Sequence, residues 1–176
     1  LFTGLAVYRV LYFSDFVQAS NRLSVFWGTI NNAVLLTSSL TMVLAVNQAR
    51  LGRKKMLAVL LVATALLGTA FLGIKAIEYS KDFTEHLIPG PNFAFSEFYS
   101  NKAELFFILY FIMTGLHAIH LIIGIIVVLI MAARSYRGTF SKEYFTPIEI
   151  TGLYWHFIDV VWVFLFPVLY LVERNI

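Results

Sequence analysis

The stretch Leu105-Phe-Phe-Ile-Leu-Tyr-Phe-Ile-Met-Thr-Gly-Leu-His-Ala-Ile-His-Leu-Ile-Ile-Gly-Ile-Ile-Val-Val-Leu-Ile-Met-Ala-Ala133 contains no charged residue. About 20 consecutive apolar residues are enough for a helix to cross the hydrocarbon core of a membrane, so this stretch predicts a transmembrane helix. The whole chain has the same character, since 60% of its 176 residues are hydrophobic, 13% are charged and its mean hydropathy is +0.81. A soluble domain carries more charge and arranges its apolar residues in amphipathic stripes, so the sequence predicts an all-α, polytopic membrane protein.

Short charged connections divide residues 1–176 into the spans of a single transmembrane bundle. The N-terminal stretch Leu1–Tyr8 is apolar but too short to span a membrane, and it lacks the basic residues and cleavage site of a signal peptide. We expect it to be the C-terminal part of a helix whose beginning lies outside this sequence. The prediction is five helices with the first truncated, at about residues 1–12 (partial), 23–46, 56–79, 105–133 and 148–172.

The charges of the connections predict the orientation. The connection 47–55 holds four basic residues and no acidic one, and 134–145 holds three basic residues against one acid, whereas 80–104 is acidic on balance. The positive-inside rule places the two basic connections in the cytoplasm and the C-terminus outside. The net charge of +3 by itself indicates little, because the placement of the charges matters more. No nucleic-acid partner is expected. The absence of cysteine excludes disulfides, thiolate nucleophiles and cysteine-ligated metal sites.

Histidines within the predicted spans are candidates for a site, because ionisable groups are costly in a bilayer. His117 and His120 are three residues apart, so we expect them on one helix face. One hypothesis is metal or haem ligation with His156 as the partner, although the Glu-x-x-His pairs of di-iron bundles are missing. We favour the alternative that these two histidines hydrogen bond to neighbouring helices or lipid headgroups, with Gly115 and Gly124 allowing close helix approach.

The last span contains a second polar pair, His156 and Asp159. Their spacing would let Asp159 orient the imidazole and partly charge it. A catalytic dyad would also need a nucleophile or bound substrate, and no motif marks one. We therefore expect an internal polar contact, with Trp155 and Trp162 packing on one helix face.

Lys75 and Glu78 have the same spacing near one end of another span, which predicts an i,i+3 ion pair, with a proton relay as the alternative. A polar, small-residue stripe in the 23–46 span predicts helix–helix contacts. That stripe consists of Asn31, Asn32, Thr37, Ser38, Ser39 and Thr41.

Four motifs together resemble one known family. Gly115-Leu-His-Ala-Ile-His-Leu-Ile-Ile-Gly124 is similar to its Gly-x-His-x-x-His segment, and Tyr154-Trp-His-Phe-Ile-Asp-Val-Val-Trp-Val-Phe-Leu165 to its last-helix signature. Leu35-Leu-Thr-Ser-Ser39 and Gly73-Ile-Lys-Ala-Ile-Glu-Tyr79 match two further helices. Order and spacing agree from about residue 2 to 172, so the chain resembles subunit III of haem-copper terminal oxidases, the cytochrome c oxidase subunit 3 family, in its short bacterial five-helix form.

The resemblance implies a V of two helix groups with phospholipid in the cleft, in a bacterial plasma (inner) membrane. It implies packing on oxidase subunit I, which holds the haems and copper, within a complex that also contains subunit II and other respiratory-complex subunits. The chain would bind no redox centre itself, would have no catalytic residue, and would support proton uptake by subunit I during oxygen reduction. Its polar residues would be structural or lipid-binding: Glu78, His117, His120, His156 and Asp159.

Three other functions stay open at this point. The chain could be an accessory subunit of a quinol oxidase or of a nitric oxide reductase. It could be a haem-b membrane anchor that uses His120 and His156 as ligands. A small transporter is the third alternative, but it predicts broken helices or inverted repeats, which the sequence lacks.

Overall fold

The protein is a bundle of long helices. The structure, a computed structural model, describes residues 25–84, 100–141 and 143–170, and no β-strand occurs in these ranges. Four helices account for most of them: α3 (Val25–Arg50), α4 (Lys54–Thr84), α5 (Ser100–Tyr136) and α6 (Thr146–Tyr170). Each contains a segment long and apolar enough to cross a membrane.

The four helices coincide with the four complete spans predicted from the sequence. The α4 and α5 helices extend several residues beyond the predicted bounds, to Thr84 and from Ser100. These extensions contain charged residues, which do not interrupt a helix once it leaves the hydrocarbon region. The predicted partial helix at residues 1–12 lies outside the described residues.

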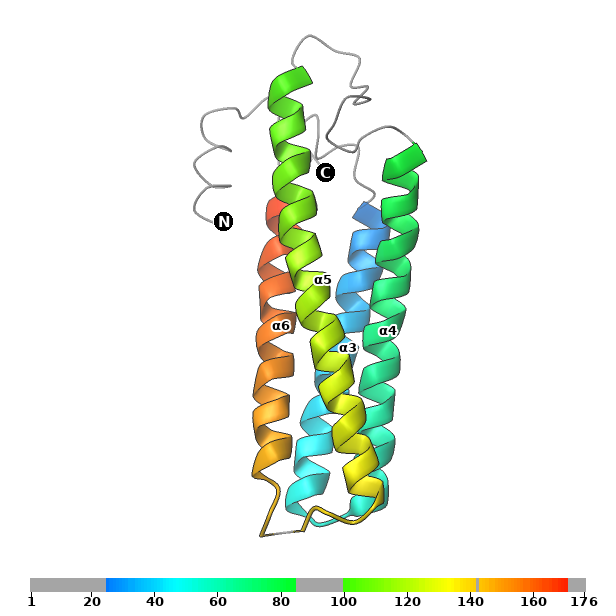
Figure 1. Cartoon of the computed structure of the whole chain (residues 1–176), viewed down its shortest axis with the longest axis vertical. Helices are drawn as coiled ribbons and strands as arrows, with labels where there is room; N and C mark the ends of the chain where they lie inside the picture. The colour runs from blue at the N-terminus through cyan, green and yellow to red at the C-terminus, as the bar shows by residue number, and fades with distance from the viewer. Residues whose placement is uncertain (1–24, 85–99, 142, 171–176) are drawn as a thin grey trace.

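Consecutive helices run antiparallel and close into a ring, in which α3 contacts α4 and α6, and α5 contacts the same two helices (Figure 1). The α3–α4 and α5–α6 connections therefore lie at the same end of the bundle, which we call the basic end. The half of the bundle away from these two connections is called the distal half below. The four described helices form one bundle, and a division into the two groups of the predicted V is not seen among them.

Both connections at the basic end begin with a glycine cap. Gly52 and Gly138 have φ angles of 72° and 81°, a left-handed conformation that glycine adopts without a Cβ clash. In each case the next amide donates to the carbonyl five residues back, over 3.0 Å at Arg53 and 3.1 Å at Thr139, as in a Schellman motif. Lys54 joins the two turns, because its carbonyl accepts from the Ser135 hydroxyl and its ammonium donates to the Gly138 carbonyl.

Trp155 lies at the centre of the ring and contacts all four helices. Its side chain projects from α6, has no exposed surface, and donates its indole N–H to Ser38 Oγ on α3 over 2.8 Å. The edge of the ring lies against Gly68 on α4, where an added Cβ would be 2.8 Å from Trp155 Cη2. On the other side the ring reaches Gly124 on α5, where an added Cβ would be 3.3 Å away. The predicted role of Gly124 in close packing is thus confirmed, whereas nothing lies within 4 Å of such a Cβ at Gly115.

Large apolar side chains also cover the outside of the ring. Examples are Leu40 on α3, Leu66 on α4, Ile126 on α5 and Leu153 on α6, each more than half exposed. Such a surface is disfavoured in water but matches lipid chains. The bundle therefore has an apolar exterior on every described helix, as expected for a protein surrounded by membrane.

The contact between Trp155 and Gly68 gives a test of the packing. We expect Gly68→Ala to destabilise the protein by about 1–3 kcal/mol, because the added methyl group must displace an indole that is fixed by Ser38 and Gly124. Gly73→Ala is the matched control on the same helix, since its methyl group meets nothing within 4 Å. The measurement is the midpoint of unfolding in detergent, and equal midpoints for the two variants would contradict the packing described here.

Candidate functional site

The distal half of the bundle contains most of the buried charge. Lys75 and Glu78 on α4 are each 6% exposed, and a distance of 2.7 Å joins Lys75 Nζ to Glu78 Oε2. The ion pair predicted from the i,i+3 spacing is therefore present, and it lies inside the bundle. A buried pair of this kind offsets the cost of removing two charges from water only if further polar groups complete it.

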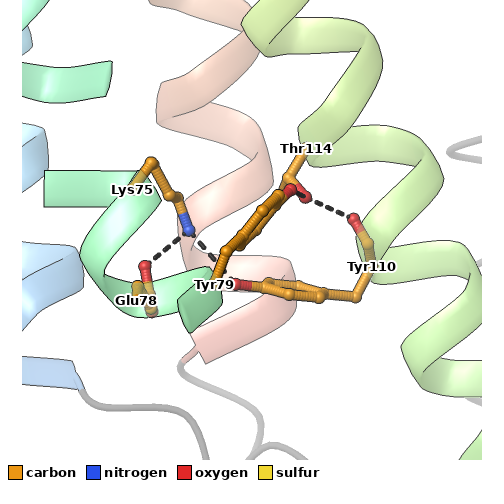
Figure 2. A network of polar contacts seen from close by, with 5 residues as sticks. All are labelled: Lys75, Glu78, Tyr79, Tyr110 and Thr114. Carbon is orange, nitrogen blue, oxygen red and sulfur yellow. Dashed lines mark hydrogen bonds and ion pairs between the residues drawn. The ribbon is translucent and has the colours of Figure 1, made fainter. Parts of the chain in front are cut away.

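Aromatic side chains from two other helices surround the Lys75 ammonium. Its Nζ donates to the Tyr110 hydroxyl on α5 over 3.3 Å (Figure 2). It also lies over the rings of Trp162 on α6, Tyr110 and Tyr79, at 4.8, 5.3 and 5.9 Å from the ring centroids. Cation–π attraction of this kind stabilises a desolvated cation. The charge is thus held between α4, α5 and α6.

A second set of hydrogen bonds connects α4 to α5 beside this pair. The hydroxyls of Tyr79 and Thr114 are hydrogen bonded to each other, and Thr114 Oγ1 donates to the Tyr110 carbonyl over 2.7 Å (Figure 2). The sequence analysis did not single out Tyr110 and Thr114. Their i,i+4 spacing inside an apolar run, followed three residues later by His117, is a signal that could have identified them as one buried polar face.

His117 and His120 face different surroundings. His117 is 5% exposed and packs its ring against those of Trp162 and Phe71, with centroids 5.0 and 5.6 Å apart. His120 is exposed, and its Nδ1 bonds to the Leu116 carbonyl of its own helix over 2.8 Å. Three residues turn a helix by about 300°, so the two side chains diverge by about 60° and only one of them enters the core.

The two histidines differ in burial, but both line one pocket between α5 and α6. Neither ring hydrogen bonds to a neighbouring helix within the described part of the chain, so that part of the prediction is wrong. His117 makes ring contacts to α4 and α6 instead, and its Nε2 has no hydrogen-bond partner among the residues that the structure describes. Contact with lipid headgroups, the other part, stays a prediction.

The predicted contact between His156 and Asp159 is also not formed. His156 Nδ1 is hydrogen bonded to Ser39 Oγ on α3 over 2.7 Å, so His156 joins α6 to α3. Asp159 is 3% exposed, and Ser39 lies beside its carboxylate, but neither carboxylate oxygen makes a hydrogen bond to a described residue. Because His156 faces the α3–α6 seam and Asp159 faces the interior, the imidazole is oriented by a serine. The prediction that Trp155 and Trp162 pack on one face is confirmed, since both are fully buried.

The described residues do not form the contacts of a serine hydrolase triad, nor do three of them converge as metal ligands. A serine hydrolase needs the second imidazole nitrogen bonded to an orienting carboxylate, and Asp159 does not bond to His156. Among the described residues, no three His, Asp, Glu or Cys side chains converge as metal ligands. The polar contacts that the structure shows here are hydrogen bonds and an ion pair, and several of the hydrogen bonds join different helices.

Two grooves open on either side of α6. One, of about 540 Å³, lies between α3 and α6 towards the basic end and is lined by Val43, Val46, Leu153 and His156. Arg50 and Glu149 line its end and form an exposed ion pair of 2.6 Å. The other, of about 260 Å³, lies between α5 and α6, is almost entirely apolar, and includes His117 and His120. Of the candidate histidines, His156 thus belongs to one groove and His120 to the other.

A known family of proteins matches nearly all of the chain. The family model described as cytochrome c oxidase subunit III matches residues 17–173, which include all four described helices. The chain belongs to the cytochrome c oxidase subunit III family. The family predicted from the four motifs is thereby confirmed, and with the four membrane-crossing helices the chain is a multi-pass membrane protein.

Relatives in this subunit III family come from bacteria and plants. Cytochrome c oxidase subunit 3 of Alkalihalophilus pseudofirmus is 36% identical over 142 residues, which cover 81% of this chain and 64% of the relative. Cytochrome bo(3) ubiquinol oxidase subunit 3 of Pseudomonas aeruginosa is 31% identical over 142 residues, covering 81% and 62%. Cytochrome c oxidase subunit 3 of Arabidopsis thaliana is 33% identical over 141 residues, covering 80% and 48%. The matched region therefore spans between about half and two thirds of these relatives.

The buried ion pair of this subunit III family member is testable. We expect Glu78→Gln to cost about 3–5 kcal/mol of stability, because it leaves the Lys75 ammonium buried without a carboxylate. The double variant Lys75→Met/Glu78→Leu should lose much less, since it removes both charges. Both are compared by detergent unfolding of the purified protein.

Arg50→Gln is the control for charge removal at an exposed pair. Its guanidinium is 61% exposed in the pair with Glu149, so breaking that pair should cost less than about 1 kcal/mol. A Glu78→Gln variant as stable as Arg50→Gln would show that the Lys75–Glu78 pair does not hold the distal half together.

Proposed function

We propose that this chain is the non-catalytic subunit III of a bacterial aerobic haem-copper oxidase. The observation that carries the proposal is the family match over residues 17–173, together with relatives that are named as oxidase third subunits in two bacteria. Its partners are subunit I, which would hold the haems and copper and on which it packs directly, together with subunit II and other respiratory-complex subunits. The electron donor to the complex is cytochrome c.

The proposed role is mechanical. A ring of four helices fixed by Trp155 and by the Lys75–Glu78 pair makes a stiff wall in the membrane. Packed on subunit I, such a wall keeps the geometry and hydration of the proton uptake path in place during oxygen reduction. The residues of this chain act by holding helices, and proton transfer takes place in the neighbouring subunit.

We include bound phospholipid in this proposal. The apolar exterior of the described helices and the groove between α3 and α6 support it, because the groove combines apolar walls with a cation and an anion at its end. Glu78, His117 and Asp159 are buried in the distal half, and we propose a structural role for them. His120 is exposed, and His156 lines the groove, so these two are the residues we propose for lipid contact.

The membrane placement is the bacterial plasma membrane with the basic end in the cytoplasm and the C-terminus outside. The basic residues that flank Gly52 and Gly138 support this orientation by the positive-inside rule. We also propose that residues 1–12 form part of a fifth helix. The predicted V would then need a second helix group beside the described ring.

A quinol oxidase is the second candidate, because the Pseudomonas relative is a ubiquinol oxidase subunit. The haem-b anchor has less support. His120 and His156 lie in grooves on opposite sides of α6, and a single iron would need both imidazoles on one side.

The test is purification of the complex in mild detergent through a tag on this chain, followed by subunit identification and an optical difference spectrum. We expect haem a and copper to arrive with a larger subunit and to leave when that subunit is removed. Oxidation of cytochrome c or of a quinol by the complex then identifies the donor. Haem b retained by the isolated chain would overturn the proposal.

Replacement of the two candidate ligands gives a sharper version of the same test. We expect the double variant His120→Ala/His156→Ala to keep the haem content and spectrum of the purified complex unchanged, because neither residue holds iron. The assembly yield is measured in parallel. Loss of a haem band at unchanged yield would show that one of these histidines is a ligand.

A further inference from the structure

Besides Oδ1 of the partly buried Asn32, four buried side chains of the distal half carry polar atoms without a hydrogen-bond partner in the part of the chain that the structure describes. They are both amide atoms of Asn31, Nε2 of His117, both carboxylate oxygens of Asp159 and Nε1 of Trp162. All four side chains are at most 5% exposed. Buried polar groups in proteins are almost always hydrogen bonded, so four such side chains in one region need an explanation.

The helix register brings these groups together. Ser38 on α3 and Trp155 on α6 are hydrogen bonded to each other, and the two helices run antiparallel. Asn31 lies seven residues before Ser38, and Trp162 lies seven residues after Trp155, so each is two helical turns further along the same face. Asn31 and Trp162 are therefore expected at the same height along the bundle axis, facing each other across α3 and α6 as Ser38 and Trp155 do.

The other two side chains lie around Trp162. The His117 ring centroid is 5.0 Å from that of Trp162, and Asp159 is three residues before Trp162 on the buried face of α6. We call Asn31, His117, Asp159 and Trp162 the Trp162 cluster. Its members come from α3, α5 and α6, and Lys75 Nζ of α4 lies over the Trp162 ring at 4.8 Å.

A cavity of about 160 Å³ adjoins this cluster between α4 and α5. Its wall is mostly apolar, but five of the residues that line it, His117, Trp162, Lys75, Tyr79 and Thr114, have side chains with a hydrogen-bonding group. A cavity of roughly 15 Å³ already holds a water molecule if two to four polar partners surround it. The cavity next to Trp162 therefore has room for several water molecules and the groups to bind them.

The hydrogen-bonding groups of the cluster indicate which kind of ligand it can bind. The indole N–H and the amide nitrogen of Asn31 are donors, whereas the Asp159 carboxylate and the Asn31 carbonyl are acceptors. A small anion would meet the carboxylate of Asp159, and a metal cation would meet the Lys75 ammonium. A lipid chain would leave every one of these groups unpaired. Water both donates and accepts hydrogen bonds, so it fits this mixture of groups.

We propose that the Trp162 cluster is a binding site for several ordered water molecules at the axis of the distal half. These waters bridge α3, α5 and α6 by bonding to Trp162, His117, Asp159 and Asn31. Seven residues closer to the basic end, the corresponding pair Trp155 and Ser38 is hydrogen bonded directly, without water. The inference does not depend on the proposed oxidase function, because it uses only contacts within this chain. By this proposal, the interior of the distal half contains water, and the interior around Trp155 does not.

The two tryptophans provide a matched test in the assembled complex. The exchange of indole N–H for deuterium is followed by ultraviolet resonance Raman spectroscopy after transfer into D₂O. We expect Trp162→Phe to abolish a rapidly exchanging indole signal and Trp155→Phe to abolish a protected one, with Trp27 present in both variants. A Trp162 signal as protected as that of Trp155 would overturn the proposal.

A map of the wild-type complex at a resolution that shows ordered water is the second measurement, and it needs no variant to fold. We expect density within hydrogen-bond distance of Trp162 Nε1 and the Asp159 carboxylate. In the Asp159→Leu variant, the water density next to residue 159 should be lost, while the hydrogen bond between Trp155 and Ser38 remains. Density for an acyl chain in the cavity, or a direct bond between Asn31 and Trp162, would overturn the proposal.

Discussion

The contact of Trp155 with the other three helices sets the distances within the ring. Its indole fills the space left by Gly68 and Gly124, and its N–H bonds to Ser38. In a membrane the surroundings are as apolar as the core, so close packing and hydrogen bonds between helices must hold the bundle together. A large side chain placed between two glycines meets this need, because its ring packs closely against two helices and its one polar atom is hydrogen bonded to a third.

The polar groups of the distal half depend on this spacing. With the helices fixed at Trp155, the Lys75 ammonium, already paired with Glu78 on its own helix, comes within reach of the Tyr110 hydroxyl on α5 and of the Trp162 ring on α6. An ion pair buried in a bilayer is stable only with such a complete set of partners. The two halves therefore differ: the half near the basic end is closed by glycine-capped turns and by hydrogen bonds such as those of Lys54, whereas the distal half contains a buried ion pair.

This arrangement is consistent with a supporting subunit. The buried polar residues of the described helices point inward, and large apolar side chains cover much of the outer faces of these helices. A protein with such an exterior can pack against another membrane subunit or against lipid over much of its surface. A rigid partner of this kind is what a catalytic subunit with a narrow proton path would need.

The sequence alone determined the class of protein, the four complete helices and the family, because uninterrupted apolar runs and short motifs are local properties of the chain. It also determined the Lys75–Glu78 pair, since both residues lie on one helix. Only the tertiary structure decided which partner each remaining polar residue has. His117 turned inward and His120 outward, and His156 bonded to Ser39 on another helix and not to Asp159. The spacing of residues on one helix predicts the direction in which each side chain points. The partner that the side chain meets depends on the register of the neighbouring helix. That register follows from the positions at which Trp155 packs against Gly68 and Gly124.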